Sequence, residues 1–299
     1  MRQAENKVFI EGVISEIDIE ESSYSKNGKD VEVIRGTIKV RVDQEINKEM
    51  KSLEIPVSVF APKITSKNAL NPAYTSLQTV MKEYKSIAAV GIDDADRVRI
   101  SGASIRMNGY WATSDKYVSY PRINASFINR VGKNECVPKA TFTAELVVSN
   151  VVDEMDRDGN PTGNMIVNAI LMQYGGKAER VPFIAKNPAV IDAVSSYWQP
   201  GDTVKATGKL NFSSTTTKIV EEQGFGEPIE KTRTVSVSEL VITGGSQSPL
   251  EGEFAFDPAE VRVAVQQMEE AKEADRQKKI QKDNHSAPKA TNSFDNLGF

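Results

Sequence analysis

The sequence predicts a mainly β protein built from two similar small barrels, followed by a charged helix and a polar tail. Two observations support this prediction. Residues 8–42 and 141–174 are an internal repeat, and both copies alternate apolar and polar side chains in the way that strands do. In both copies a helical pattern then falls between the third and the fourth predicted strand.

The repeat begins with two strands joined by a polar loop that contains a glycine. It reads "VFIEGVISEIDIEESSYSKNGKDVEVIRGTIKVRV" in the first copy and "TFTAELVVSNVVDEMDRDGNPTGNMIVNAILMQY" in the second. A third strand follows in each, "LEIPVSVFA" (53–61) and "ERVPFIA" (179–185). An alternating run that is bounded by such turn residues is typical of antiparallel strands.

A helix with an Asn-Pro start comes next in both copies, over 71–88 and 187–198. Both helices lead into a fourth strand, expected in 93–105 and 199–212, and a fifth follows near 117–130 and 232–243. This order is typical of the OB-fold, a five-stranded barrel. A β-sandwich with two helices is the alternative. Paired barrels are favoured because both helices occupy the same place in the strand order.

The predicted domains are therefore an OB-fold at 1–135, a second at 136–249, a charged helix at 250–283 and a flexible tail at 284–299. The helix is expected to start at Pro258 behind an Asp257 cap, with an apolar stripe of Val261, Val265 and Met268. The tail is small and polar and is expected to be disordered.

The composition offers little for catalysis. One histidine, His285, and one cysteine, Cys136, exclude a multi-histidine metal site and an internal disulfide. We expect no enzyme activity, no catalytic residue, no cofactor and no metal. No apolar run reaches bilayer length, and the N-terminus lacks the apolar stretch of a signal peptide, so we expect a cytoplasmic protein without a membrane partner.

Basic and aromatic residues are concentrated in the first predicted barrel. The formal net charge of the chain is −4, yet residues 96–133 hold seven basic side chains and only two acidic ones. Alternation places Lys39, Arg41, Arg97 and Arg99 on the outside of the barrel, with Phe60 beside them. Tyr110 and Trp111 are expected in the loop between the fourth and fifth strands.

On these grounds the sequence predicts a single-stranded nucleic-acid site, because cations contact phosphates and rings stack on bases. A solvated strand face with rings covering a barrel end is the alternative. The predicted binding residues are Lys39, Arg41, Phe60, Arg97, Arg99, Arg106, Tyr110, Trp111, Lys116, Tyr117, Tyr120 and Arg122. The second barrel has fewer rings and is expected to bind weakly or to be structural.

The segment "ADRVRISGASIRMNGYW…KYVSYPRINASFINRV" resembles the fourth and fifth strands of single-stranded DNA-binding proteins, and "NKVFIEGVISEID" resembles their first strand. The resemblance implies a protein that coats single-stranded DNA during replication, recombination or repair. Bacterial members usually have one barrel per chain and form tetramers. Two barrels in one acidic chain look more like a bacteriophage protein, expected as a monomer or dimer in the bacterial host cytoplasm.

The tail end "SFDNLGF" resembles the tip with which those proteins recruit replication and recombination enzymes, although it has one acid and Gly298 where they have proline. The predicted partner-binding residues are Phe294, Asp295, Leu297 and Phe299. The main alternative function is a structural or assembly protein of a virion, with OB barrels as adaptor modules. An annealing or recombination-mediator protein would share the DNA-binding face.

Overall fold

The computed structural model describes residues 2–26, 28–46, 48–221 and 229–286. The first barrel contains β1 (Asn6–Lys26), β2 (Lys29–Ile46), β3 (Glu49–Pro62), α1 (Pro72–Glu83), α2 (Ile87–Val90), β4 (Arg97–Trp111), β5 (Tyr117–Ala125) and β6 (Asn129–Val131). The second contains β7 (Lys139–Met155), β8 (Pro161–Gln173), β9 (Lys177–Ala185), α3 (Pro188–Tyr197), β10 (Thr203–Glu221) and β11 (Ile229–Gly245). A short 3-10 helix (Gly252–Phe254) and α4 (Pro258–Ser286) follow.

Each barrel closes in the strand order of an OB-fold. In the first, β1 pairs with both β2 and β4, β3 pairs in parallel with β5, and β4 pairs with β5. In the second, β7 pairs with both β8 and β10, and β9 pairs in parallel with β11. The helices α1 and α3 connect the third strand to the fourth. The prediction of a mainly β protein with two tandem OB-folds is confirmed.

The two helices begin as the Asn-Pro pattern predicts. The side-chain oxygen of Asn71 accepts a hydrogen bond from the backbone N–H of Ala73 at 3.1 Å, and Asn187 does the same for Ala189 at 3.0 Å. Such caps satisfy N–H groups that have no partner within the helix. α1 ends at Glu83, earlier than predicted, and buries Leu77 and Val80 in the barrel.

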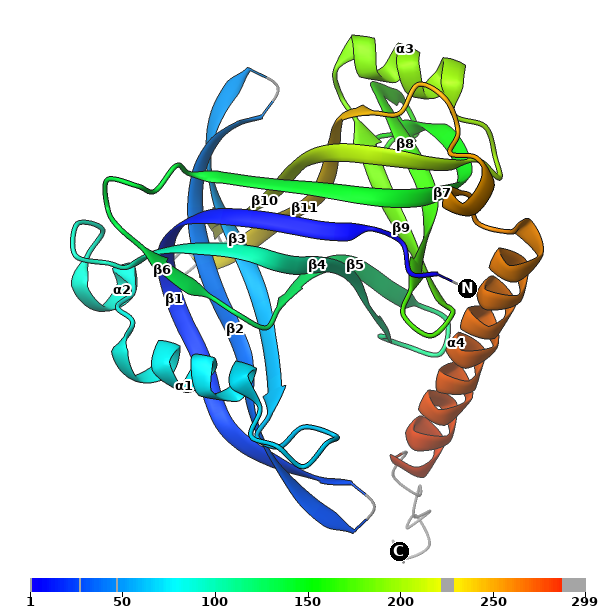
Figure 1. Ribbon diagram of the computed structural model, residues 1–299. Coiled ribbons are helices and arrows are strands. Elements are labelled where there is room, and N and C mark those ends of the chain that lie inside the picture. The colour runs from blue at the N-terminus through cyan, green and yellow to red at the C-terminus, as the bar shows by residue number, and fades with distance from the viewer. Residues whose placement is uncertain (1, 27, 47, 222–228, 287–299) are drawn as a thin grey trace, which may run out of the picture.

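The barrels are joined edge to edge by β1 and β7, which pair antiparallel from Asn6 opposite Ala144 to Glu11 opposite Lys139. Figure 1 shows the two barrels side by side, with α1 and α2 on one and α3 on the other. Most of the buried apolar residues of the two barrels form one connected cluster. The two repeats therefore fold around a shared core.

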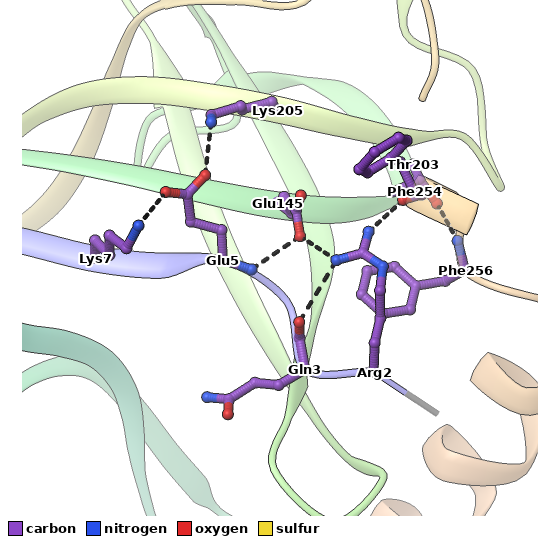
Figure 2. A network of polar contacts seen from close by, with 9 residues as sticks. All are labelled: Arg2, Gln3, Glu5, Lys7, Glu145, Thr203, Lys205, Phe254 and Phe256. Carbon is purple, nitrogen blue, oxygen red and sulfur yellow. Dashed lines mark hydrogen bonds and ion pairs between the residues drawn. The ribbon is translucent and has the colours of Figure 1, made fainter. Parts of the chain in front are cut away.

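The N-terminal segment fastens the first barrel to the second (Figure 2). Arg2 forms an ion pair with Glu145 and donates a hydrogen bond to the carbonyl of Phe254. Glu5 lies between Lys205, at 2.6 Å, and Lys7, at 2.8 Å. The hydrogen bond from Lys205 is the main reason that the pKa of Glu5 lies below its usual value, and Lys7 adds to it.

The C-terminal helix α4 starts on the second barrel. Asp257 caps it, with its carboxylate accepting from the N–H of Ala259 at 2.8 Å. Val261 and Ala264 belong to a buried apolar cluster with Ile170 of β8 and Ala178 of β9. α4 then runs on past this barrel toward the β4–β5 hairpin of the first (Figure 1). In the parts of the chain that the structure describes, no helix is long and apolar enough to cross a bilayer.

Candidate nucleic-acid interface

A groove of about 910 Å³ crosses strands β1 to β5 of the first barrel. We call it the barrel groove. Its basic and aromatic lining residues are Arg35, Phe60, Arg106 and Arg122. The rest of the lining is mostly small or polar: Gly36, Thr37, Ser58, Val59, Gly102, Ser104, Asn124, Ala125 and Ser126, with the acids Asp18 and Glu20. Small side chains let an extended ligand approach the sheet closely.

The strand pattern places these side chains in the groove. Arg35 follows the buried Ile34 on β2, so its side chain points away from the core. Gly36 has a φ of +142°, and a Cβ there would lie 2.1 Å from the backbone oxygen of Asp18. Only glycine allows β1 and β2 to approach so closely at this point.

Three arginines give the barrel groove its positive charge, but their surroundings differ. Arg35 pairs with Glu20 at 3.2 Å, and both side chains are more than half exposed. Such surface pairs contribute only about 0–1 kcal/mol, so a phosphate can replace the carboxylate. Arg106 pairs with Glu179 of the second barrel at 3.2 Å.

Arg122 differs from both. Its guanidinium donates a hydrogen bond to the hydroxyl of Ser58. Among the residues that the structure describes, no carboxylate lies within ion-pair distance of Arg122. Of the three arginines, it is therefore the one whose charge is least compensated.

An exposed aromatic pair stands at the β2–β3 side of the groove. Phe60 is 55% exposed, and its ring centroid lies 6.2 Å from that of Tyr24 on β1. About half of the Phe60 side chain is therefore open to solvent even though it lies near Tyr24. Phe60 thus offers a face on which a planar ligand such as a base could stack.

The corresponding surface of the second barrel is smaller and acidic. Pro56 and Pro182 align in the repeat, so Ser58 and Ile184 occupy equivalent positions. Ser58 pairs in parallel with Asn124, and Ile184 pairs in parallel with Val241. Arg122 and Glu239 lie two residues before these partners. Glu239 therefore takes the place of Arg122. The pocket there has a volume of about 140 Å³ and is lined by two carboxylates, Glu154 and Glu239. Glu239 pairs with Lys186 at 2.7 Å. The pocket is therefore small, and it has a carboxylate rather than an arginine at the position of Arg122.

Arg97 and Arg99 were expected beside Phe60, and the structure places them elsewhere. They lie at the start of β4, between β1 and β6, whereas the barrel groove uses the later part of β4. Arg99 holds the buried carboxylate of Glu11 with two hydrogen bonds, of 2.9 and 3.0 Å. Arg97 donates to the carbonyls of residues 93 and 95. The alternation of the strand correctly predicted that Arg97 and Arg99 point outward, but it did not predict which residues surround them.

Lys39 and Arg41 do point outward from β2, as predicted, but neither lines the barrel groove. Lys39 pairs with Glu16 at 2.6 Å, and this hydrogen bond raises its pKa. Arg41 pairs with Asp43 at 3.3 Å. Lys116 is exposed in the β4–β5 turn.

The predicted rings fall on two faces of the β4–β5 hairpin. Tyr110 and Trp111 were expected in a loop, but β4 continues to Trp111. Successive residues of a strand point to opposite faces. Tyr110 and Tyr120, 50% and 42% exposed, extend the row that begins with Arg106 and Arg122.

Trp111 and Tyr117 form the other set, with ring centroids 5.1 Å apart, and they pack against α4. The indole N–H of Trp111 donates to the carbonyl of Lys272 at 3.1 Å. These two rings therefore hold the helix, which the sequence did not predict.

Arg35, which lines the barrel groove, and Tyr24, which lies beside Phe60, were absent from the predicted set. Arg35 shares the alternation of Lys39 and Arg41, so the same pattern could have found it. Tyr24 had no comparable signal, because only its pairing with Phe60 distinguishes it from other exposed strand residues. The predicted partner-binding residues Phe294, Asp295, Leu297 and Phe299 lie outside the described part of the chain.

Comparison with solved structures finds the single-stranded DNA-binding protein from Thermus aquaticus, in its wild-type form, at 10% identity and a TM-score of 0.48. A deletion mutant of that protein matches at 11% identity and a TM-score of 0.46. Each match covers 86% of this chain and 99% of the other. No curated protein matches the chain. The family model described as YorF matches residues 4–286, so the chain belongs to the YorF family.

Proposed function

We propose that this protein binds single-stranded DNA in the barrel groove of its first OB-fold. The observation that carries the proposal is Arg122, a cation that lines a 910 Å³ groove and has no carboxylate partner among the described residues. Arg35 and Arg106 lie in the same groove, and Phe60 is exposed at its side.

The combination of arginines and an exposed ring in one groove favours binding of a single strand over a duplex. Side-chain cations contact phosphates, but a ring can stack only on a base that is not already stacked and paired. In a duplex the base faces are hidden, so Phe60 would contribute nothing. The corresponding pocket of the second barrel is small and has Glu239 in the place of Arg122, which supports one principal binding surface per chain, in the first barrel.

Substitution of the groove residues tests the proposal. We expect Phe60→Ala to weaken binding of a fluorescent oligo(dT) by about 1–3 kcal/mol, the cost of one lost stacking contact. We expect Arg122→Gln to lower the slope of log affinity against log salt by about 0.7, because one phosphate contact is lost. Fluorescence anisotropy over a range of salt concentrations measures both quantities.

Two variants of the second barrel serve as matched controls. Tyr174→Ala removes a ring that is 81% exposed, and Arg157→Gln removes an exposed arginine from the β7–β8 turn. Both should bind oligo(dT) like the wild type. Wild-type protein that leaves oligo(dT) unbound at low salt, or groove variants that bind normally, would overturn the proposal.

The proposal extends to the biological role. We infer a non-enzymatic protein that acts as a monomer or dimer in the cytoplasm of a bacterial host, where it coats single strands during phage replication or recombination. The sequence resemblance and the scarcity of histidine and cysteine support this role. The tip "SFDNLGF" is proposed to recruit partner proteins. Its deletion should abolish co-purification of such partners and leave oligo(dT) affinity within about twofold.

A further inference from the structure

A second, smaller groove lies between the β4–β5 hairpin and α4. We call it the hairpin–helix groove. Its volume is about 300 Å³, and the hairpin contributes Tyr110, Trp111 and Tyr117 to its lining. The helix contributes four lysines and one acid: Lys272, Asp275, Lys278, Lys279 and Lys282. The groove therefore combines rings on one wall with an excess of positive charge on the other.

The helix wall follows from the spacing of its residues. Positions three and four apart lie on one face of a helix, so residues 272, 275, 279 and 282 face the same direction, with 278 beside them. Lys278 pairs with Asp275 at 2.8 Å, and Lys279 pairs with Asp283 at 3.1 Å. Exposed pairs at this spacing contribute little, so a phosphate can displace their carboxylates.

Arg276 and Lys272 hold the helix against the hairpin, whereas Lys278 and Lys279 line the groove without these ring contacts. Arg276 donates a hydrogen bond to the carbonyl of Ser114 at 2.7 Å, and its guanidinium carbon lies 5.3 Å from the ring centroid of Trp111. The ammonium of Lys272 lies 4.1 Å from the ring centroid of Tyr117. Neither the hairpin nor the helix forms this groove alone.

The hairpin connects this groove to the barrel groove. Arg106 pairs with Arg122, and two residues further on, Asn108 pairs with Tyr120. Tyr110, the next residue with the same direction, lines the hairpin–helix groove. Strands rise about 3.3 Å per residue, so the polar and aromatic row spans about 13 Å from Arg106 to Tyr110.

We propose that the hairpin–helix groove is a second contact site for the same DNA strand, with lysines of α4 binding phosphates beyond the barrel groove. This inference rests on the proposed function and assigns a nucleic-acid contact to the C-terminal helix. A long oligonucleotide occupies both grooves, and a short one occupies the barrel groove alone.

The variant Lys278→Gln/Lys279→Gln tests the inference, because the cation–π contacts that the described residues make with Trp111 and Tyr117 come from Lys272 and Arg276. We expect affinity for oligo(dT) of about 20 nucleotides to fall about tenfold at 0.1 M salt, and the salt slope to fall by about 1.4. Affinity for an oligo(dT) of about six nucleotides, within the site size of one OB-fold, should not change.

The control Arg262→Gln/Lys177→Gln removes two exposed charges outside both grooves and should bind both oligonucleotides like the wild type. Tryptophan fluorescence adds an independent signal. Trp198 is 4% exposed, so quenching by DNA reports on Trp111. The 20-nucleotide oligomer should quench this fluorescence, and the six-nucleotide oligomer should not.

The outcomes separate the two proposals. If wild-type protein binds neither oligonucleotide, the proposed function itself fails. If it binds both and the lysine variant binds the long one normally, the barrel groove stands and the inference about α4 is wrong. If the lysine variant instead loses affinity for poly-aspartate while keeping that for long oligo(dT), the groove is an acidic-peptide site, and the inference is likewise wrong.

Discussion

At the scale of single residues, Glu11 shows how a charge inside a strand can be structural. Its side chain is 3% exposed, and its carboxylate accepts two hydrogen bonds from Arg99 and one from the N–H of Val137. Arg99, followed by the N–H of Val137, lowers the pKa of Glu11 despite the opposing effect of burial. Through these hydrogen bonds, Glu11 of β1 is linked to Arg99 of β4 and to Val137 of the segment between the two barrels.

Replacement of this carboxylate should destabilise the protein. We expect Glu11→Gln to lower the free energy of unfolding by about 1–3 kcal/mol at pH 7, since a buried charge-assisted hydrogen-bond network loses an acceptor. Urea unfolding followed by circular dichroism measures the change. Lys7→Gln, which alters an exposed side chain, should shift stability by less than about 0.5 kcal/mol.

The effect of Glu11 should depend on pH. A lowered pKa means that the ionised carboxylate stabilises the folded state. This contribution is complete above the unfolded value of about 4.3 and is lost as the pH falls through the lower folded value. The difference in stability between wild type and Glu11→Gln should therefore shrink below about pH 4. A constant difference down to pH 2 would show that the charge plays no part.

At the scale of elements, the β4–β5 hairpin uses its two faces for different purposes. One face extends the barrel groove through Arg106, Arg122 and Tyr120. The other packs Trp111 and Tyr117 against α4, where a Cβ at Gly109 would lie 1.9 Å from the Tyr117 hydroxyl. The same strand period that exposes the first face fixes the second against the helix.

Loss of the hairpin contacts should release only part of α4. We expect Arg276→Ala to increase amide hydrogen exchange in residues 270–284 at least tenfold. Exchange in 260–266 should be unchanged, because Val261 and Ala264 still pack on the second barrel. Hydrogen exchange with mass spectrometry resolves the two halves. Equal acceleration of exchange along the whole helix would show that the two halves of α4 are not held separately. Arg262→Ala, on the same helix, is the control.

At the scale of the whole molecule, the two barrels form one structural unit. Gln44 of β2 is 6% exposed, and its amide donates to the carbonyls of Ala140 and Leu210 and accepts from the N–H of Ala140. These bonds cross from the first barrel to the second. Together with the β1–β7 pairing and the continuous core, they couple the folding of the two repeats.

The wild type should consequently unfold in a single transition. Urea curves followed by tryptophan fluorescence and by circular dichroism should coincide. Gln44→Ala should lower the midpoint, with a loss of about 1–3 kcal/mol, because backbone groups buried at the barrel junction lose their partner. Two separate transitions in the wild type would show that the barrels fold independently.

Part of this structure could be predicted because it depends on neighbours in the sequence. The Asn-Pro starts of α1 and α3, the outward direction of Phe60 and the strand order of both barrels follow from local pattern and from the repeat. The placement of Arg99, Arg106 and Trp111 does not. Their partners Glu11, Glu179 and Lys272 are 88, 73 and 161 residues away in the chain.

The sequence by itself determined two OB-folds, their helices and the outward alternation of basic and aromatic residues in the first, because strand period and turn chemistry are local. Only the tertiary structure decided which of these residues share a surface. It gave Arg35, Arg106, Arg122 and Phe60 a common groove, and it turned Trp111 toward α4. Whether an outward side chain meets solvent, a carboxylate or a helix depends on packing between distant segments, which no local pattern encodes.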